Sequence, residues 1–370
     1  MNWTRDTAKT VVINVAIMFT LIGILVAAPI ALIKTYDVFR AIVPASSGDW
    51  RQQLPNYAEI TWANQYFSDH KNIGASYSDF VVWELNPLSS ETINIDDSGR
   101  RHTVTPEGIS SGSVWVFGGS TVFGTGVNDA NTIPSLLAEK TGLQAVNFGG
   151  DNYIARQNVI RLLREYETND TENLIVVFYD GVNDVHVKCR VENLDLVTDR
   201  QAQIRNALGD NRAAADASPI QLLRPARVLI DKVSQRGVLG GPGEETEDLY
   251  VCDDDVDRAD QVARTLVSDW KAAQAITETN GGRFVAILQP VSYLSDTRLD
   301  HLTPGAYDAE FAKQYSAVYP LIRSYASAAG INFFDLSHVF DHDEFIYIDF
   351  CHVSPNGNEY MAEALATVIS

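Results

Sequence analysis

The sequence predicts an α/β protein in which a five-stranded parallel sheet is covered by helices on both faces. From residue 113 onward, short apolar runs alternate with longer helical patterns, which is typical of a three-layer α/β/α sandwich. The predicted strands span residues 114–117, 145–148, 174–179, 284–289 and 332–335. The predicted helices span residues 132–140, 156–166, 261–279, 308–329 and 356–367.

Residues 11–33 predict one transmembrane helix ahead of this sandwich. They contain no charged side chain, and at 1.5 Å per residue they reach across a hydrocarbon core of about 30 Å. A cleaved signal peptide is the alternative, but its apolar region is usually only about 7 to 15 residues long. The small residues 26–28 are also followed by Pro29, which disfavours cleavage. We therefore expect residues 1–34 to be a short tail and an uncleaved anchor.

The orientation of this anchor is less strongly specified by charge. Basic residues lie on both sides of the apolar stretch, with Arg5 and Lys9 before it and Lys34 and Arg40 after it. A short tail ahead of a single span most simply stays in the cytoplasm. The expectation is a single-pass membrane protein whose globular part lies on the non-cytoplasmic side.

Residues 35–112 predict a small β-containing region that packs on the main domain. Residues 80–85 and 92–95 have strand patterns, and residues 97–100 have turn chemistry ahead of a further strand at 102–104. Four aromatic residues lie close together in this region: Trp50, Tyr57, Trp62 and Tyr66. They could line a substrate groove, but aromatic residues dominate cores generally, so we expect them to pack inside.

The main domain spans residues 113–370, and its first strand ends in a candidate nucleophile. The apolar run 114–117 is β-branched and aromatic, as expected for a central parallel strand, and it stops at Gly118 and Gly119. Ser120 follows directly, at the carboxyl end of the strand, where open α/β sheets bind ligands. A Gly-Gly-Ser turn alone is more often structural than catalytic.

An insertion of roughly eighty residues, at about 185–260, interrupts the alternation between the third and fourth strands. Long segments of this kind are usually functional lids or linkers. Cys189 and Cys252 flank it, and in an oxidising compartment a disulfide between them would close its base. The three cysteines lack C-x-x-C spacing, and Asp180 and Asp184 have no partner cluster, so no metal site is expected.

Composition excludes one class of partner. The formal net charge of -20 and a pI near 4.6 argue against nucleic acid, whose phosphates would be repelled over the whole surface. Acidity otherwise indicates solubility and not a particular function.

Two further segments place chemically active side chains at strand ends. Asn183 follows the apolar strand 174–179, so its amide reaches the same sheet edge as Ser120 and could donate to an oxyanion. Asp349 and His352 stand three residues apart before the last helix, where a tight turn lets the carboxylate fix the imidazole tautomer. These side chains supply the base, the carboxylate and the donor that a serine nucleophile needs.

Other polar residues near this edge have weaker claims. His186, His301 and Ser292 could touch a substrate but are more often structural at such positions. Cys351 is expected to pack as a small apolar residue.

Over residues 113–370 the sequence resembles the SGNH, or GDSL-type, hydrolases. Gly118-Gly119-Ser120 resembles a Gly-Gly-Ser variant of the family's first block, residues 181–184 match its G-x-N-D block, and residues 349–352 match its D-x-x-H block. The resemblance implies a flavodoxin-like SGNH fold and a catalytic triad of Ser120, His352 and Asp349. It also implies an acyl-enzyme mechanism that requires no cofactor.

One block departs from the family pattern. The resemblance implies an oxyanion hole formed by the backbone N–H of Ser120, the side chain of Asn183 and a backbone N–H that a glycine usually provides. Here that position is Asn152, and asparagine is among the few residues that tolerate positive φ. If the alignment shifts, Gly149 or Gly150 would take the role.

The resemblance implies a serine esterase, with O-acetyl groups on a carbohydrate as the leading substrate class. Anchorage and the polar lead-in favour a bulky cell-envelope or extracellular glycan over a small soluble ester. An O-acyltransferase that uses the same serine ester remains an alternative. A second alternative is a non-catalytic, membrane-anchored binding or assembly protein that retains the fold, although such a protein has no need of all three triad groups.

Overall fold

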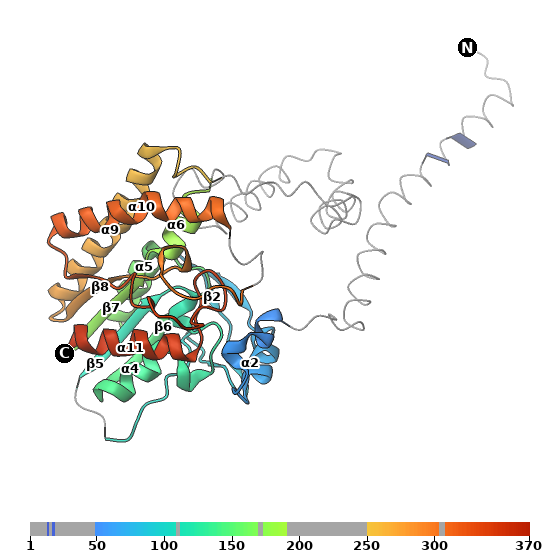
Figure 1. Cartoon of the computed structure of the whole chain (residues 1–370), viewed down its shortest axis with the longest axis horizontal. Helices are drawn as coiled ribbons and strands as arrows, with labels where there is room; N and C mark the ends of the chain where they lie inside the picture. Colours follow the sequence, from blue (N-terminus) through green and yellow to red (C-terminus); the bar gives the residue numbers. More distant parts are fainter. Residues whose placement is uncertain are drawn as a thin grey trace, which may run out of the picture. The chain divides into compact units, whose positions relative to one another are not determined.

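The predicted parallel sheet is present, with its five strands in the order β6-β5-β7-β8-β9 (Figure 1). These strands are β5 (Ser113–Gly118), β6 (Gln144–Gly149), β7 (Leu174–Asp180), β8 (Arg283–Leu288) and β9 (Phe333–Asp335), all paired in parallel. The order is the flavodoxin-like one, which grows from its first strand to both sides and leaves a ligand crevice beyond the carboxyl ends of β5 and β7. The sheet and its helices fit an SGNH-type fold.

The computed structural model describes residues 49–108, 112–168, 173–190, 250–302 and 308–370, together with residues 13, 14, 17 and 18. Most of the predicted membrane span, residues 11–33, and most of the insertion at 185–260 lie outside these ranges. Among the described residues, no helix has the length and apolar character needed to cross a membrane. The described residues from 49 onward form one compact unit.

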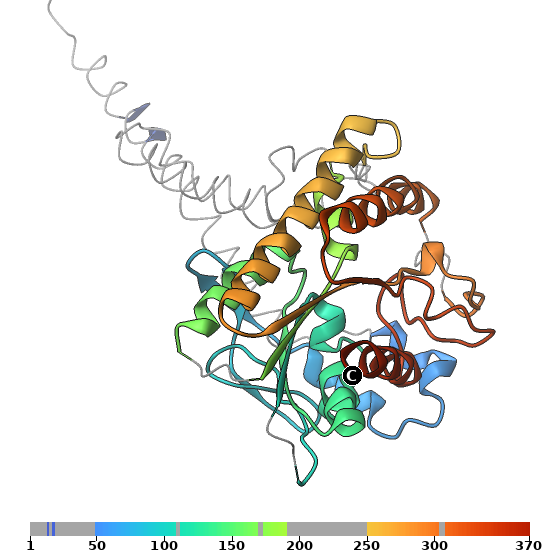
Figure 2. The ribbon, with the colours of Figure 1, turned by 90° about the vertical axis from the view of Figure 1, so that its left-hand side faces the viewer.

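Helices cover both faces of the sheet, as the alternation predicted. They are α3 (Ser120–Phe123), α4 (Ile133–Thr141), α5 (Ala155–Tyr166), α6 (Val182–Lys188), α9 (Val256–Thr279), α10 (Ala309–Ala329) and α11 (Pro355–Ile369), with short 3-10 turns η3 (Asp129–Asn131) and η6 (Ser292–Leu294). Figure 2 shows α9 and α10 on one face of the sheet and α4 and α11 on the other. This arrangement leaves the carboxyl ends of the strands for the loops that carry polar side chains.

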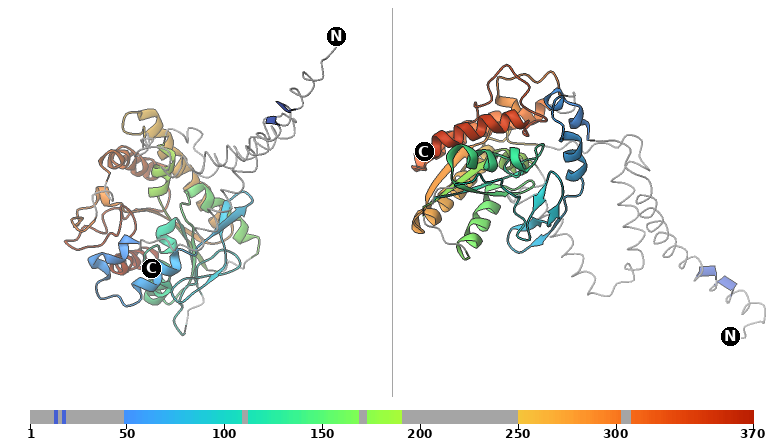
Figure 3. Two further views of the ribbon diagram at one scale, coloured as in Figure 1. Left: turned by 90° about the vertical axis from the view of Figure 1, so that its right-hand side faces the viewer. Right: turned by 90° about the horizontal axis from the view of Figure 1, so that it is seen from below.

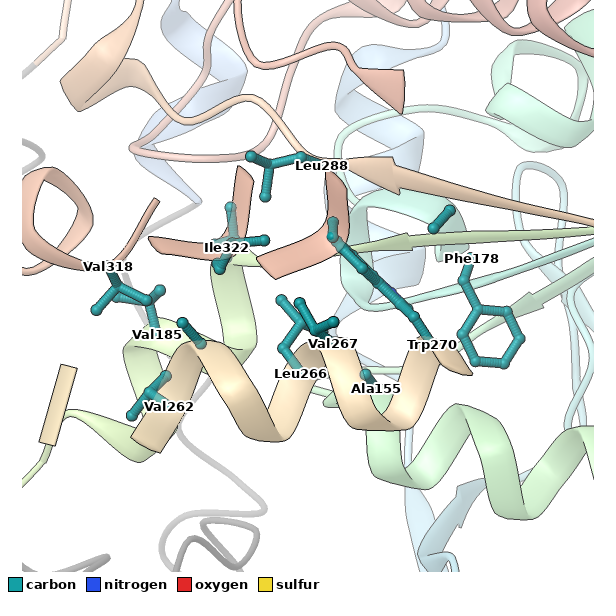
Figure 4. Close-up of a cluster of buried hydrophobic side chains, with 14 of the residues drawn as sticks. Ala155, Phe178, Val185, Val262, Leu266, Val267, Trp270, Leu288, Val318 and Ile322 are labelled. Atoms are coloured by element: carbon teal, nitrogen blue, oxygen red, sulfur yellow. The ribbon is translucent and has the colours of Figure 1, made fainter. Parts of the chain in front are cut away.

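Alternate residues of each strand enter different cores. Trp115 and Phe117 of β5 pack with α5, α9 and α10, whereas Val114 and Val116 pack with α4 and α11. Figure 4 shows part of the first core, in which Trp270 of α9 lies beside the sheet. Because both faces are buried, the strands read as continuous apolar runs, and this made them recognisable in the sequence.

The N-terminal segment, residues 49–108, packs against the sheet module (Figure 3). It contains η1 (Trp50–Gln53), η2 (Pro55–Tyr57), α2 (Ala63–His70), β1 (Ala75–Ser78), β2 (Val82–Leu85), β3 (Leu88–Ser89) and β4 (Asn94–Ile95). Tyr57 and Tyr66 are buried with Phe123 and Ile348 of the module, whereas Trp50 is exposed. Two of the four predicted packing aromatics therefore lie in the core that joins the segment to the module.

The strands of this segment differ from the prediction. The predicted strand at 102–104 is absent: Arg101 forms isolated bridges with Ile95 and Asn147, and beyond it the N–H of Val104 bonds Ser135 Oγ of α4 at 3.0 Å. The strand predicted from residue 80 begins only at Val82, because residues 79–81 form the turn between β1 and β2, where Phe80 has positive φ. β2 pairs instead with β1, a strand that the pattern did not indicate.

The two ends of the insertion meet beside α6. Cys189 and Cys252 form a disulfide, the N–H of Val251 donates to the carbonyl of Cys189 at 3.0 Å, and Arg190 forms a bridge with Tyr250. The chain therefore leaves and re-enters the described module at one point, close to the end of α6.

Candidate active site

Ser120 begins α3 immediately after β5, at the crevice that the strand order creates. Gly118 and Gly119 make this turn possible through close approach: a Cβ at Gly118 would collide with Val122, and one at Gly119 would collide with the Asn183 amide. The Ser120 hydroxyl lies 2.7 Å from Nε2 of His352, which comes from the other end of the sequence. The structure therefore brings these two predicted residues into hydrogen-bond contact.

His352 and Asp349 share a tight loop ahead of α11. Tyr347 and Val353 form a bridge at its base, and the N–H of Ile348 donates to the carbonyl of His352 at 2.9 Å. Nδ1 of His352 lies 2.7 and 2.9 Å from the two carboxylate oxygens of Asp349. A carboxylate only accepts, so Nδ1 carries the proton and Nε2 accepts from Ser120.

Asp349 is buried but ionised. Burial alone would raise its pKa; the charge and hydrogen bonds of His352, together with the charge of Arg51, outweigh this and hold the pKa well below its usual range. Oδ1 also accepts from the backbone N–H groups of Cys351 at 3.0 Å and His352 at 2.8 Å. The carboxylate is thus fixed in the charge state and orientation that a Ser-His-Asp triad requires.

Arg51 is a neighbour of the triad that the sequence pattern did not reveal. Its Nη1 donates to Oδ2 of Asp349 at 3.1 Å, and its Nε and Nη2 donate to Asp49 at 3.0 and 2.8 Å. Burial opposes its charge, but the two carboxylates outweigh burial and raise the pKa of Arg51 above its ordinary value. The pairing spans 298 positions, so no local pattern could have shown it.

Of the predicted oxyanion donors, the Asn183 amide lies close to Gly119, the residue before Ser120. Asn183 sits in α6, and its Nδ2 donates one hydrogen to the carbonyl of Tyr153 at 2.8 Å, which leaves the second hydrogen for another acceptor. Asn152 has φ of 56°, a positive value that asparagine tolerates better than most residues. Over the described ranges, neither the N–H of Ser120 nor that of Asn152 has a hydrogen-bond acceptor.

The two alternative donors are already engaged. The N–H of Gly149 donates to Oδ1 of Asn147 at 2.9 Å, and that of Gly150 donates to the carbonyl of Gly118 at 3.1 Å. Neither is available to an oxyanion without breaking a hydrogen bond of the fold. Of the candidates, the geometry favours Asn152.

The β1–β2 hairpin braces the loop that carries Asn152. Nε1 of Trp83 donates to the carbonyl of Asp151 at 3.1 Å, and the Tyr153 hydroxyl donates to the carbonyl of Trp83 at 2.6 Å. The two rings pack edge to face at 5.7 Å. Burial raises the pKa of Tyr153 to about 12, so its hydroxyl stays a donor. Val82, beside Trp83, has φ of 82°, which is strained for a β-branched residue and characteristic of functional segments.

Arg101 braces the turn after the nucleophile. Its side chain is fully buried and pairs with Asp129 at 2.9 Å, while Nη1 donates to the carbonyls of Phe123 and Gly124 at 2.9 and 2.7 Å. Nη2 donates to the carbonyl of Val127 at 2.6 Å. The guanidinium thereby holds the backbone that follows α3.

Cys351 and the two buried aspartates do not form a second reactive centre. Burial raises the pKa of the Cys351 thiol well above its ordinary value, and Cys351 packs in the core. Asp184 pairs with the buried Lys188, while Asp180 accepts from Asn158 at 2.8 Å and Trp270 at 3.0 Å. Ligand-type atoms of Asp349, Cys351 and His352 lie within 4.8 Å of one another, but the carboxylate and imidazole are engaged in the triad.

Aromatic rings gather beside the triad loop. Phe350 lies between Asp349 and Cys351 in sequence, and its ring is 6.0 Å from that of His186, 5.9 Å from that of Tyr293 and 5.3 Å from that of Phe311. His186 is one helical turn from Asn183, so this aromatic cluster borders both the triad loop and an oxyanion donor. His301 lies apart, with Nε2 2.7 Å from the carbonyl of Tyr347. Ser292 is buried, and its N–H bonds the carbonyl of Phe350.

Comparison with known proteins gives structural likeness without sequence relatives. No known family profile matches the sequence, and no curated protein matches it. Similar solved structures include LAE5, an α/β hydrolase from the metagenome of Lake Arreo in Spain, with 15% identity, 70% of this chain and 95% of that chain covered, and a TM-score of 0.38.

Two further similar structures are enzymes of related description. One is a lipolytic protein of the G-D-S-L family from Veillonella parvula, with 11% identity, coverage of 70% and 98%, and a TM-score of 0.39. The other is Est24, a carbohydrate acetylesterase from Sinorhizobium meliloti, with 13% identity, coverage of 70% and 98%, and a TM-score of 0.33. At such low identities and TM-scores, the likeness carries no argument about the activity of this chain.

Proposed function

We propose that this protein is a serine ester hydrolase of the SGNH type. The observation that carries the proposal is the continuous hydrogen-bonded chain from Ser120 through His352 to Asp349, with the Asn183 amide close to Gly119, the residue before the serine. A structural serine has no need of an oriented imidazole and an ionised carboxylate behind it. The arrangement is suited to acyl transfer.

Each step of the proposed reaction has a residue that performs it. As the Ser120 oxygen attacks the ester carbonyl carbon, His352 Nε2 takes the hydroxyl proton, and Asp349 stabilises the imidazolium through Nδ1–H. The N–H groups of Ser120 and Asn152 and the free hydrogen of Asn183 bind the carbonyl oxygen as it becomes negative. The intermediate collapses, the imidazolium protonates the departing alcohol oxygen, and an ester of Ser120 remains. Water then attacks this ester, with His352 again as base, and releases the acid.

The proposed substrate is a carboxylic ester on a carbohydrate, with O-acetyl groups as the leading class. In this proposal the sugar packs against the rings of His186, Tyr293 and Phe350, which are partly exposed beside the triad loop. A membrane anchor at residues 11–33 would place the domain beside a cell-envelope or extracellular glycan. Protease treatment of intact cells tests whether the domain is exposed at the outer surface. Protection of the domain from the protease would contradict that exposure.

The first experiment uses the full chain in detergent with p-nitrophenyl acetate. We expect a burst of p-nitrophenol, an acetyl adduct on Ser120 and turnover that disappears in Ser120→Ala. The matched control is Ser292→Ala, since Ser292 is also a serine at the carboxyl edge of the sheet, but among the described hydrogen bonds its N–H pairs with Phe350 and none joins it to His352. Equal turnover in Ser120→Ala and the intact chain would overturn the assignment of the nucleophile.

Acetylated polysaccharides and sugar acceptors extend the same experiment. Release of acetate that requires Ser120 supports the hydrolase. Transfer of the acetyl group to a sugar hydroxyl in place of water would identify the acyltransferase alternative. Binding of the polysaccharide without release or transfer, and without any adduct on Ser120, would identify a non-catalytic protein.

A further inference from the structure

The side chain of Arg51 connects the N-terminal segment to the triad. It belongs to η1, and its guanidinium lies between two carboxylates, Asp49 on its own turn and Asp349 on the triad loop. All three side chains are largely buried, with 15% of Arg51, 19% of Asp49 and 18% of Asp349 exposed. Ion pairs at this depth are much less screened by solvent than surface pairs.

The bond from Arg51 to Asp349 comes from a different part of the chain than the other hydrogen bonds that Asp349 accepts. Oδ1 accepts from Cys351 and His352, which belong to the same short loop. Arg51 is the partner from outside that loop among the residues that the structure describes. Those bonds orient the carboxylate within its own loop, whereas the bond from Arg51 ties the carboxylate to η1.

We infer that Arg51 is a positioning residue of the triad, which pins Asp349 and thereby the His352 ring toward Ser120, and that Asp49 holds Arg51 in place. The inference rests on the proposed function. In this inference the N-terminal segment contributes a residue on which the reaction depends. Arg51 acts on the reaction only through Asp349. Arg51 touches neither Ser120 nor His352 in the described contacts.

The charged and titratable groups around this contact come from four elements. The triad loop provides Asp349, Cys351 and His352; η1 provides Asp49 and Arg51; η2 provides Tyr57; and α2 provides Tyr66 and His70. Burial and the charge of Arg51 lower the pKa of His70 to about 4, so His70 is neutral near pH 7. The charges that set the pH profile here are therefore those of Asp49, Arg51 and Asp349.

The test compares Arg51→Gln, Arg51→Lys and Asp49→Asn in the full chain in detergent, with Arg100→Gln as control. Arg100 is an arginine of the same segment whose ion pair with Asp96 is more exposed and lies outside the triad contacts. We expect Arg51→Gln to lower kcat about tenfold to a hundredfold with little change in KM, the scale of one charge-assisted hydrogen bond. Arg51→Lys should recover part of this loss, and Arg100→Gln should leave kcat unchanged.

The pH profile separates positioning from a general folding defect. Removing the cation in Arg51→Gln favours a protonated imidazole, so the acid limb of kcat/KM moves to higher pH. Removing the anion in Asp49→Asn leaves Arg51 less compensated, so the same limb moves to lower pH. A loosened fold does not move the limb in opposite directions. If the acid limb of kcat/KM lies at the same pH in Arg51→Gln, in Asp49→Asn and in the intact chain, the inference is overturned.

A spectroscopic readout is independent of turnover. In protein labelled with ¹⁵N-histidine, the Nδ1 proton shared by His352 and Asp349 should give a downfield resonance that disappears in His352→Gln. We expect it to weaken or move in Arg51→Gln and to persist in Arg100→Gln. A resonance unchanged in Arg51→Gln contradicts the positioning role. If the intact chain shows no esterase activity but the resonance depends on Arg51, the proposed function fails while the positioning inference stands.

Discussion

The sheet module and the N-terminal segment divide the site between them. The module supplies the proposed catalytic groups: Ser120, Asn183, Asp349 and His352 lie at the carboxyl ends of its strands or just before its last helix. The segment supplies the contacts that hold those groups: Arg51 on Asp349, Trp83 on the loop of Asn152, and Arg101 on the turn after Ser120. The loop that carries Asp349 and His352 therefore belongs to one region and is held by contacts from the other.

The largest expected effect lies in the module. Asp349→Asn keeps the shape of the side chain but replaces an acceptor of the Nδ1 proton by an amide that can also donate, so the wrong imidazole tautomer becomes favourable. We expect kcat to fall about 10⁴-fold, as is typical for this change in serine triads. Steady-state kinetics with p-nitrophenyl acetate measure the change, and Asp343→Asn, an exposed aspartate near the same end of the chain, is the control. A loss below tenfold would show that Asp349 is dispensable and would break the division of roles.

The next effect lies in the segment and concerns stability. Arg101→Met removes a buried guanidinium, so Asp129 loses its ion-pair partner and the carbonyls of Phe123, Gly124 and Val127 each lose a hydrogen bond. We expect the free energy of unfolding to fall by about 3–5 kcal/mol, the usual result of breaking one side of a buried ion pair. Urea denaturation followed by tryptophan fluorescence measures it, with Arg100→Met as the exposed control. If both variants unfold at the same urea concentration, Arg101 does not brace the nucleophile turn.

Asn183→Ala tests the oxyanion donor that the module provides. Removing one such donor typically costs about 10²- to 10³-fold in kcat, because the developing charge loses a preorganised partner. KM should change little, since the donor acts most strongly in the transition state. Asn158→Ala is a poor control because its amide bonds the buried Asp180, so Asn332→Ala, at the far end of the sheet, is preferred. Full turnover in Asn183→Ala would contradict the assigned role.

The sequence predicted the module far better than the segment, and the reason is physical. Strands buried on both faces read as apolar runs, and the polar residues that follow them reach the same sheet edge, so Ser120, Asn183 and the Asp349–His352 loop could be found from local pattern. The contacts of the segment join residues far apart in the sequence, such as Arg51 with Asp349, and an arginine in a short turn has no distinguishing pattern. The failure at residues 102–104 has the same cause, because a long-range bond from Val104 to Ser135 overrides the local strand propensity.

The smallest effect tests whether the segment also holds the oxyanion loop. Trp83→Phe keeps an aromatic ring against Tyr153 but loses the hydrogen bond from Nε1 to the carbonyl of Asp151. We expect kcat to fall about fivefold, and the lost neutral hydrogen bond to lower the free energy of unfolding by roughly 1 kcal/mol. Trp62→Phe, in the same segment but packed on α2, is the matched control. A combined Trp83→Phe, Asn183→Ala enzyme sharpens the result: if Trp83 acts by placing the N–H of Asn152 in the same oxyanion hole, the two losses will deviate from additivity. Losses that simply add would mean that the hairpin stabilises the fold without positioning the donor.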